Sequence, residues 1–540
     1  MSMSSARRNA LIAASLALPI VAGGWILQER ATRDGARLFD QVLSLVSDRF
    51  VDTVGTASLY EKAAKGLIDQ LNDPYSELLS PKAAERFSAT STGRYGGVGM
   101  QIEKQQENIV VVRVFPNTPA ERAGIVEGDR IAVVDTMSTR GWSTQQVSDV
   151  LLGTPGTKVR ARFSRPGVAQ PIDHQLTRAI INVPAVPYAL MLDGKIGYLP
   201  LLTFNESASR EVAAAADRLM KQGARGIIVD VRDNPGGILE QALSISDAFL
   251  NSGQEIASVR GRDGATQKFQ AQGRNRFPAI PLVVMVNGYS ASASEIVAGS
   301  LQDHDRALVV GTTSYGKGLV QSVFPLEGGY SLKLTTAKWF TPSGRSIQKD
   351  RTPARPGTLP AGVAARAPQS DIDETPDSLE QESVKKNRPT FRSDAGRIVY
   401  GGGGITPDVI VPEDTISTVE QDFARALAPK GAIVRAALYD MALTLKGKIT
   451  PDIQPKPEWR EEFLRRLEKD SVAVNPKQFQ AATALVDRWI THQVIRQSFG
   501  DSTLFRRTLA EDAQMQKALE LIRKGQTQQD LFTLARASIK

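Results

Sequence analysis

Cysteine is absent from the 540 residues, and histidine occurs three times, at His174, His304 and His492. The absence of cysteine excludes thiol catalysis, disulfide bonds, and zinc or iron–sulfur sites built on thiolates. No two histidines stand at metal-ligand spacing, so we expect no metal site built on them. A Ser-His-Asp triad also lacks a suitable histidine, so a serine nucleophile here would need another base.

The chain has no long block of basic residues, although its net charge is +8 from 66 Lys and Arg against 58 Asp and Glu. A nucleic-acid partner is therefore not expected, because such proteins gather their basic residues on one face. Hydrophobic residues make up 41% and charged residues 23%, which is ordinary for globular proteins. The length suggests about three or four domains.

The N-terminus has the pattern of an export signal. Arg7 and Arg8 precede an apolar stretch over 10–27, and a charged segment before an apolar one is typical of such signals. The stretch of about 18 residues is nearly long enough to span a bilayer, and we find no convincing cleavage site before Gln28. We therefore predict an uncleaved anchor over 1–28 with both arginines on the cytoplasmic side; a cleaved signal peptide and a buried helix are the alternatives.

Changes of texture along the chain predict a multidomain α/β protein. Strands that alternate with helices indicate a layered α/β core, and a Pro-, Ser- and Asp-rich segment of little periodicity indicates disorder. The predicted segments are a helical region at 29–90, a unit of short strands at 91–178, an α/β core at 179–348, a disordered insertion at 349–398, a core-completing strand at 399–412 and a helical extension at 413–540.

Ser292 is the candidate nucleophile. It lies within Ser-Ala-Ser-Ala-Ser-Glu (290–295), between a buried strand and a helix. The positive potential of the helix N-terminus would favour an anion there, and the N–H of Ala293 is free to donate to an oxyanion. The alternative is that Ser292 is only the N-cap of a capping box with Glu295.

Lys317 is the candidate base. The segment 311–318 is similar to a phosphate-binding loop, but Gly318 stands where Ser or Thr is required, and a strand rather than a helix follows. Desolvation would favour a neutral lysine, and Gln321 could orient its amine without adding charge. The alternative is an exposed lysine in a turn.

Two glycine-rich segments could bind anions through backbone N–H groups. Asp-Asn-Pro-Gly-Gly (233–237) follows a buried strand, and Gly237 could supply a second oxyanion donor. Tyr-Gly-Gly-Val-Gly-Met (95–100) could form a nest for a peptide carboxylate. The alternatives are an ordinary turn and a glycine-rich hairpin.

In this order, the segments resemble the carboxy-terminal processing (tail-specific) serine proteases over roughly residues 38–412. Further segments carry the likeness: Asn-Asp-Pro-Tyr-Ser at 72–76, Pro-Ala-Glu-Arg-Ala-Gly at 119–124, Gly-Asp-Arg-Ile at 128–131, Ile-Gly-Tyr-Leu at 196–199 and Trp-Phe-Thr-Pro-Ser-Gly-Arg at 339–345. The resemblance implies a PDZ domain at 91–178 and a crotonase-like protease core at 179–348.

The resemblance also implies roles for individual residues. Ser292 would be the nucleophile, Lys317, 25 residues later, the base, and Gln321 its orienting partner. Ala293 and Gly237 would donate to the oxyanion. Asp303 matches an acidic position sometimes grouped with the dyad; we interpret it as structural, because an ionised neighbour would hinder a neutral lysine. The predicted peptide contacts of the PDZ domain are Gly97, Val98, Gly99, Met100, Val147 and Leu151.

The implied protein is a serine endopeptidase that cleaves near the apolar C-terminal tails of exported proteins without metal or nucleotide. Its expected place is the cell envelope, anchored to the inner membrane and facing the periplasm. The chain departs from many relatives, because Leu152 rather than arginine precedes Gly153. The insertion and the extension leave a homo-oligomer or an activating adaptor open. A PDZ scaffold with a dead core is the rival interpretation, and the intact Ser292, Lys317 and Gln321 argue against it.

Overall fold

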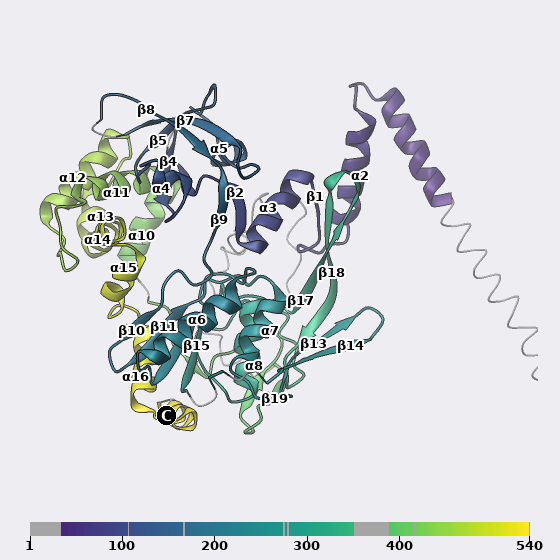
Figure 1. Ribbon diagram of the computed structural model, residues 1–540, viewed down its shortest axis with the longest axis vertical. Coiled ribbons are helices and arrows are strands. Elements are labelled where there is room, and N and C mark those ends of the chain that lie inside the picture. The colour runs from purple at the N-terminus through teal and green to yellow at the C-terminus, as the bar shows by residue number, and fades with distance from the viewer. Residues whose placement is uncertain are drawn as a thin grey trace, which may run out of the picture. The chain divides into compact units, whose positions relative to one another are not determined.

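The computed structural model describes residues 34–538 apart from positions 106, 166–167, 274–275, 278–279, 350–387 and 415. The predicted anchor over 1–28 and most of the predicted insertion lie outside the described residues. No helix within the described ranges is long and apolar enough to cross a membrane. The chain forms two units, residues up to Ser80 with Val323–Leu334, and Pro81–Ser322 with Thr335–Lys540 (Figure 1).

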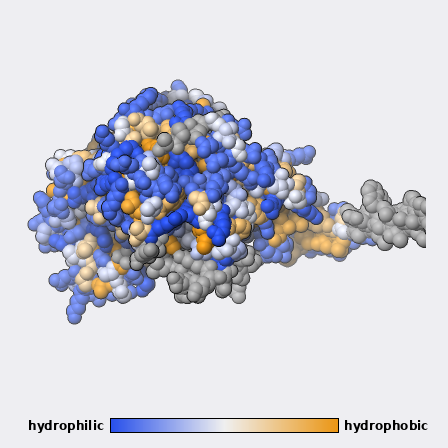
Figure 2. Space-filling view, turned by 90° about the horizontal axis from the view of Figure 1, so that it is seen from below, coloured by the Kyte–Doolittle hydropathy of each residue, from blue (hydrophilic) through white to orange (hydrophobic). Residues whose placement is uncertain are grey.

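The smaller unit combines helices with a strand. A helix over 34–49 and α2 (Thr56–Asp69) precede β1 (Glu77–Leu79), which pairs antiparallel with β18 (Ser331–Phe340). The prediction that the region 29–90 is helical is therefore wrong for β1. The Asp73 carboxylate accepts hydrogen bonds from the Tyr75 N–H and the Ser76 hydroxyl, and this turn leads the chain into the strand. Apolar side chains remain exposed on the helix over 34–49 (Figure 2).

An antiparallel sheet follows α3 (Pro81–Thr92) in the larger unit, with the strand order β3-β4-β5-β7-β8 and β6 paired to β5. Its strands are β3 (Met100–Gln105), β4 (Asn108–Val114), β5 (Arg130–Val134), β6 (Met137–Ser138), β7 (Lys158–Ser164) and β8 (Ile172–Thr177). The helices α4 (Pro119–Arg122) and α5 (Thr144–Leu151) accompany it, and α5 begins with the capping box of Ser143 and Gln146. β2 (Arg94–Gly97) pairs separately with β9 (Ala179–Asn182).

The α/β core is a six-stranded sheet of order β10-β11-β12-β15-β16-β21, parallel except for β10. Its strands are β10 (Leu190–Leu192), β11 (Ile196–Pro200), β12 (Gly226–Asp230), β15 (Leu282–Val286), β16 (Leu308–Gly311) and β21 (Val409–Ile410). Central strands such as β12 and β15 are buried along their whole length, which is why they read as continuous apolar runs.

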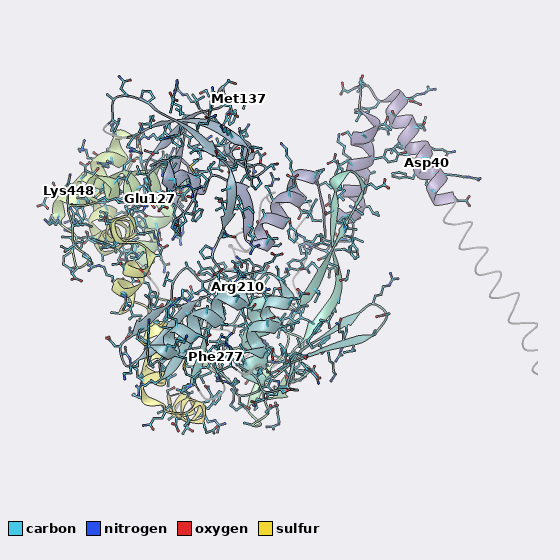
Figure 3. The ribbon with its side chains drawn as sticks, in the orientation of Figure 1. Asp40, Glu127, Met137, Arg210, Phe277 and Lys448 are labelled. Atoms are coloured by element: carbon cyan, nitrogen blue, oxygen red, sulfur yellow. The ribbon has the colours of Figure 1, made fainter. Side chains whose placement is uncertain are left out.

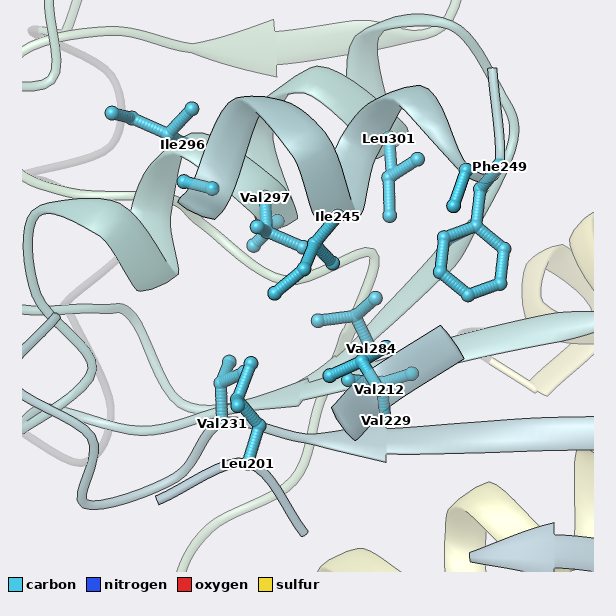
Figure 4. Close-up of a cluster of buried hydrophobic side chains, with 14 of the residues drawn as sticks. Leu201, Val212, Val229, Val231, Ile245, Phe249, Val284, Ile296, Val297 and Leu301 are labelled. Carbon is cyan, nitrogen blue, oxygen red and sulfur yellow. The ribbon is translucent and has the colours of Figure 1, made fainter. Parts of the chain in front are cut away.

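Different helices cover the two faces of this sheet. The helices α6 (Ala208–Lys221), α7 (Leu239–Asp247) and α8 (Ala293–Asp303) pack on one face (Figure 4). The other face is covered by α16 (Ala513–Lys524) and α17 (Gln528–Ser538), which come from the helical extension. The extension is therefore part of the core of the larger unit.

A second sheet lies beside the core. β13 (Glu255–Gly261) pairs antiparallel with β14 (Thr266–Gln270) and with β18, which also pairs with β17 (Leu319–Pro325). A hairpin of β19 (Thr390–Arg392) and β20 (Ile398–Tyr400) falls within and beside the predicted insertion. The prediction of disorder is wrong for 388–398, because the buried Arg388 guanidinium donates to the carbonyls of Gly401 and Gly404 and holds this segment.

The remaining helices of the extension build their own hydrophobic cluster. They are α10 (Thr418–Leu427), α11 (Gly431–Leu445), α12 (Pro457–Lys469), α13 (Pro476–Ala481) and α14 (Thr483–Phe499). Phe505 of α15 (Asp501–Thr508) packs instead against the cluster between the core sheet and the last two helices. The Tyr439 hydroxyl of α11 donates to the Val111 carbonyl of β4 at 2.9 Å. Lys446 follows α11 and forms an ion pair of 3.5 Å with Glu127, a residue that is labelled in Figure 3. The extension therefore contacts the antiparallel sheet as well as the core.

Candidate active site

Ser292 lies at the junction between the loop that follows β15 and the first turn of α8. It is the N-cap of α8, and its backbone has φ 54° and ψ −112°. Such a conformation in a residue other than glycine costs of order 1–3 kcal/mol and is typical of functional sites. The turn leaves Ser292 half-buried while its neighbours Ala291 and Ala293 are buried. The predicted capping box is present, because the Glu295 carboxylate accepts the Ser292 N–H at 2.8 Å.

Glu295 connects this turn to the loop that carries Lys317. Its Oε2 atom accepts the N–H groups of Ser292 and Lys317, the latter at 2.9 Å. Its Oε1 atom accepts the Gly316 N–H at 2.6 Å and the Ser314 hydroxyl at 2.5 Å. Burial raises the pKa of Glu295, and these four donors oppose the rise because they stabilise the carboxylate. One buried carboxyl group therefore fixes both backbone segments.

Lys317 lies in the loop between β16 and β17. Its carbonyl accepts the indole N–H of Trp339 at 3.0 Å, and the preceding Tyr315 N–H donates to the Ser290 carbonyl at 3.0 Å. Lys317 is half-buried between the buried Gly316 and Gly318. The structure therefore holds the backbone of the predicted base next to the loop of the predicted nucleophile.

The loop over 233–237 lies directly against the N-terminus of α8. Gly236 has φ 96°, and a Cβ atom on it would lie 2.8 Å from the Ala293 nitrogen and 3.0 Å from the Ser292 Cβ. Only glycine fits this close approach. The carbonyl of the fully buried Asn234 accepts the Ala291 N–H at 3.1 Å and the Ser294 hydroxyl at 2.8 Å. These bonds tie the glycine loop to both sides of Ser292.

Some backbone N–H groups around Ser292 have a hydrogen-bond acceptor within the protein and others do not. The Gly236 N–H donates to Asn234 Oδ1 at 2.9 Å. The N–H groups of Ala293 and Gly237 donate to no acceptor in the described part of the chain. Gly237 is also exposed, whereas Gly236 is buried. The geometry therefore favours Gly237 over Gly236 as a partner of Ala293.

The Gln321 and Asp303 side chains have hydrogen-bond partners outside the two loops that carry Ser292 and Lys317. The Gln321 side chain donates to the Thr335 hydroxyl at 3.3 Å across β17 and β18. Asp303 is the last residue of α8, about 16 Å along that helix from Ser292. Its carboxylate accepts Nη2 of Arg345 at 2.6 Å and the Ser343 N–H at 3.0 Å. A catalytic association of Asp303 is therefore not supported, and the structural interpretation fits its contacts.

The predicted carboxylate loop lies between β2 and β3, at the edge of the antiparallel sheet. Gly99 has φ 85°, and a Cβ atom on it would lie 2.3 Å from the Thr118 Cβ. The carbonyls of Val98 and Gly99 accept the N–H groups of Ala120 and Phe115. The N–H groups of Val98 and Gly99 have no protein acceptor within the described ranges. The loop therefore presents donors and has its acceptors occupied.

The predicted apolar contacts for a peptide are core residues in this structure. Val147 and Leu151 of α5 are 0% and 4% exposed, and they pack with Val98 and Met100 in one cluster. Gly97 is buried as well. A peptide side chain could reach Val147 and Leu151 only if α5 moved away from β3. The sequence pattern finds the helix but gives no sign that its face is closed.

An arginine that the sequence analysis missed holds the end of α5. Leu152 precedes Gly153, but the Arg178 guanidinium donates to the carbonyls of Val150 and Leu151 at 2.8 and 3.0 Å. Arginine suits a helix C-terminus because the last carbonyls there lack intrahelical partners. Arg178 directly follows β8 and is 27 residues from Leu151. No local sequence pattern therefore predicts this contact.

The groups around Ser292 and the loop between β2 and β3 together define a class of protein. A strained serine at a helix N-terminus, a lysine loop bound to it through a buried carboxyl group and two unoccupied N–H groups are the parts of a serine hydrolase. An edge strand beside a glycine loop is the arrangement of a peptide-binding module. The described residues hold no cluster of three or more His, Asp or Glu side chains suited to a metal.

Comparison with known proteins agrees with this class. The family model for peptidase family S41 matches residues 195–355, and the model for the PDZ domain matches residues 110–165. The carboxy-terminal-processing protease of Bartonella bacilliformis is 39% identical over 315 residues, which are 57% of this chain and 72% of that protein. The carboxy-terminal processing protease CtpA of Bacillus subtilis is 34% identical over 371 residues, which are 68% of this chain and 78% of that protein.

The chain therefore belongs to the PDZ-containing carboxy-terminal processing proteases and is a serine peptidase. Among solved structures, it is similar to the photosystem II D1 C-terminal processing protease, with 28% identity and a TM-score of 0.34. That likeness covers 63% of this chain and 91% of the other.

Proposed function

We propose that this peptidase uses Ser292 and Lys317 as a catalytic dyad and cleaves exported proteins near their apolar C-terminal tails. The observation that carries the proposal is the Glu295 carboxylate, which accepts the N–H groups of both residues at 2.8 and 2.9 Å. A shared acceptor fixes the two backbones relative to each other, and a dyad depends on such fixed geometry.

The reaction then follows from the groups at this site. Ser292 Oγ attacks the scissile carbonyl carbon while the neutral amine of Lys317 takes its proton. The negative charge that develops on the carbonyl oxygen is stabilised by the N–H groups of Ala293 and Gly237. Lys317 returns the proton to the leaving amine as the peptide bond breaks, which leaves an acyl-enzyme. Water, deprotonated by Lys317, releases the acyl group and restores Ser292.

The lysine has to be neutral to act as a base. Lys317 is half-buried between Gly316 and Gly318, and the proposal requires its amine to be desolvated, because desolvation disfavours the charged form of an amine. A neutral side chain such as Gln321 could orient the amine without favouring its charged form, whereas a carboxylate would favour the charged form. In this role Gln321 would accept a hydrogen bond from the lysine amine through Oε1, because its Nε2 atom already donates to the Thr335 hydroxyl.

The PDZ domain would capture the substrate tail. The N–H groups of Val98 and Gly99 would bind the terminal carboxylate, and the tail would add as a strand to the edge of β3. Displacement of α5 would open the apolar cluster of Val147 and Leu151 to the last side chain of the substrate. Delivery of a tail in this way brings a nearby peptide bond to Ser292.

The site of action is proposed from the N-terminus. Arg7 and Arg8 with the apolar stretch after them support an inner-membrane anchor that places the protease in the periplasm. Exported proteins would then be its substrates.

Cleavage of an unstructured protein with an apolar C-terminus tests this function. The full chain should cleave it, whereas Ser292→Ala and Lys317→Ala should each lose at least about a thousandfold in kcat/KM. A matched substrate that ends in two aspartates should be cleaved more slowly by the wild type. Equal cleavage by all three proteins would refute the dyad, and tail binding without cleavage by the wild type would favour a scaffold.

A further inference from the structure

Arg232 links the helical extension to the glycine loop of the active site. It is the second residue after the end of β12 and directly precedes the loop over 233–237. Its guanidinium binds Asp230 at 2.8 Å on one side and Asp512 on the other, with distances of 3.1 and 2.8 Å to the two Asp512 oxygens. Such two-point pairing of a guanidinium with a carboxylate fixes direction as well as distance.

Asp512 is itself held firmly by its own surroundings. It is the N-cap of α16, and its side chain accepts the Met515 N–H at 2.9 Å. Gln514, which is 2% exposed, also accepts from Arg232 at 3.1 Å. Because α16 packs on the core sheet through its apolar face, Asp512 offers Arg232 a rigid partner.

The link continues from Arg232 to the nucleophile. The next residue, Asp233, has the strained φ of 57° and exchanges two hydrogen bonds with Asn287 at 2.9 and 3.0 Å. Glu413, at the start of the extension, also hydrogen-bonds Asn287. Asn234 comes next, and its carbonyl binds both sides of Ser292. Two residues of the extension therefore contact residues that hold the loop over 233–237: Asp512 binds Arg232, and Glu413 binds Asn287.

We propose that Asp512 is a positioning residue for catalysis, which acts through Arg232 to hold the loop that presents the Gly237 N–H. The inference rests on the proposed function, because the loop matters for catalysis only if Gly237 serves the oxyanion. It gives the helical extension a part in the chemistry that requires no contact between Asp512 and the substrate. Loss of the link loosens the loop without disturbing tail capture by the PDZ domain.

The substitution Asp512→Asn separates this role from capping. Asparagine is as good an N-cap as aspartate, so α16 keeps its first turn, but the charge that clamps Arg232 is gone. Asp530→Asn is the matched control, because Asp530 accepts the N–H groups of Gln526 and Thr527 at 3.0 and 2.9 Å in the same extension. Asp512→Glu restores the charge and should recover part of any loss.

Three measurements on the full chain test whether Asp512 holds the loop through Arg232. For Asp512→Asn we expect kcat to fall about tenfold with KM within about twofold, less than the loss from removing an oxyanion donor itself. Labelling of Ser292 by a fluorophosphonate should slow by a similar factor. Amide hydrogen exchange of a peptide covering 231–240 should become faster, because this backbone loses its anchor.

The outcomes distinguish this inference from the proposed function. Behaviour of Asp512→Asn like Asp530→Asn in all three measurements would overturn the inference, and so would faster exchange with an unchanged kcat. A wild type that does not hydrolyse would overturn the proposed function, and with it the catalytic role of Asp512. If the wild type does not hydrolyse but amide exchange of 231–240 is faster in Asp512→Asn, Asp512 still holds the loop without a catalytic role. If exchange is also unchanged, Asp512 does not hold the loop either.

Discussion

At the scale of single residues, sequence reasoning selected the residues that we propose as the catalytic groups, and it missed the carboxyl group that connects their backbones. Ser292, Lys317 and the glycine loop could be selected because each stands in a recognisable local pattern. Glu295 was assigned only to the capping box. Its bonds to Gly316 and Lys317 use backbone N–H groups more than 20 residues away, and a backbone N–H has no signature in the sequence.

Glu295→Gln should damage both stability and activity. The amide has one acceptor oxygen for four donors, and its NH2 group would face N–H groups. Since hydrogen bonds to a buried charge are worth about 1.5–3 kcal/mol each, we expect the free energy of unfolding to fall by about 2–4 kcal/mol. The kcat should fall at least about tenfold. Urea unfolding and peptide hydrolysis measure these effects, and the exposed Glu240→Gln should change neither; an unaltered kcat would contradict the bridging role.

Gly99→Ala should impair tail capture. The new Cβ would lie 2.3 Å from the Thr118 Cβ at a backbone φ of 85°, so the loop has to shift. The matched variant is Gly124→Ala, which has φ 74° and nothing within 4 Å of the new Cβ, and which tests strain of about 1 kcal/mol alone. We expect KM for a tailed substrate to rise at least about tenfold only for Gly99→Ala. Equal KM values for the two variants would exclude the loop as the carboxylate site.

At the scale of elements, period and burial decided which segments could be predicted. Long apolar runs such as β12 and β15 were visible because both faces of these strands are buried. β1 and the β19–β20 hairpin were missed, since strands of three residues carry no period. The partners that stabilise them, β18 for β1 and the Arg388 contacts beside the hairpin, are distant or irregular. A local sequence pattern does not predict a strand that forms only because of its tertiary contacts.

The helix α14 carries a pH-sensitive group. Burial lowers the pKa of His492 below its usual value of 6.5, and Glu511, 3.7 Å away, opposes the shift. A pKa that is lower in the folded chain means that the unfolded chain binds the proton first. The stability that the neutral ring contributes is therefore present above pH 6.5 and is lost as the pH falls through its folded pKa. Urea unfolding between pH 8 and 5 should show a smaller decline for His492→Gln, and parallel curves would refute this assignment.

At the scale of the whole chain, the extension is the largest feature that sequence reasoning left without a role. It was predicted as a helical tail outside the family pattern. In the larger unit its last two helices cover one face of the core sheet, and α11 contacts the PDZ sheet. The helical period of the tail was readable, but the surface that it covers belongs to strands some 200–300 residues earlier. The sequence of the extension or of the core strands, taken alone, does not predict that the two pack together.

A substitution in α16 should therefore destabilise the core sheet. Ile522 is 1% exposed, and its Cδ1 would lie 2.8 Å from a Cβ placed on Gly226 at the start of β12. Truncation to alanine leaves a cavity between helix and sheet, so Ile522→Ala should cost about 2–5 kcal/mol in urea unfolding. Val419→Ala, 46% exposed in the same extension, should stay within about 0.5 kcal/mol. If Ile522→Ala were equally neutral, α16 would not be part of the core, and the rigid support that we assign to Asp512 would be lost with it.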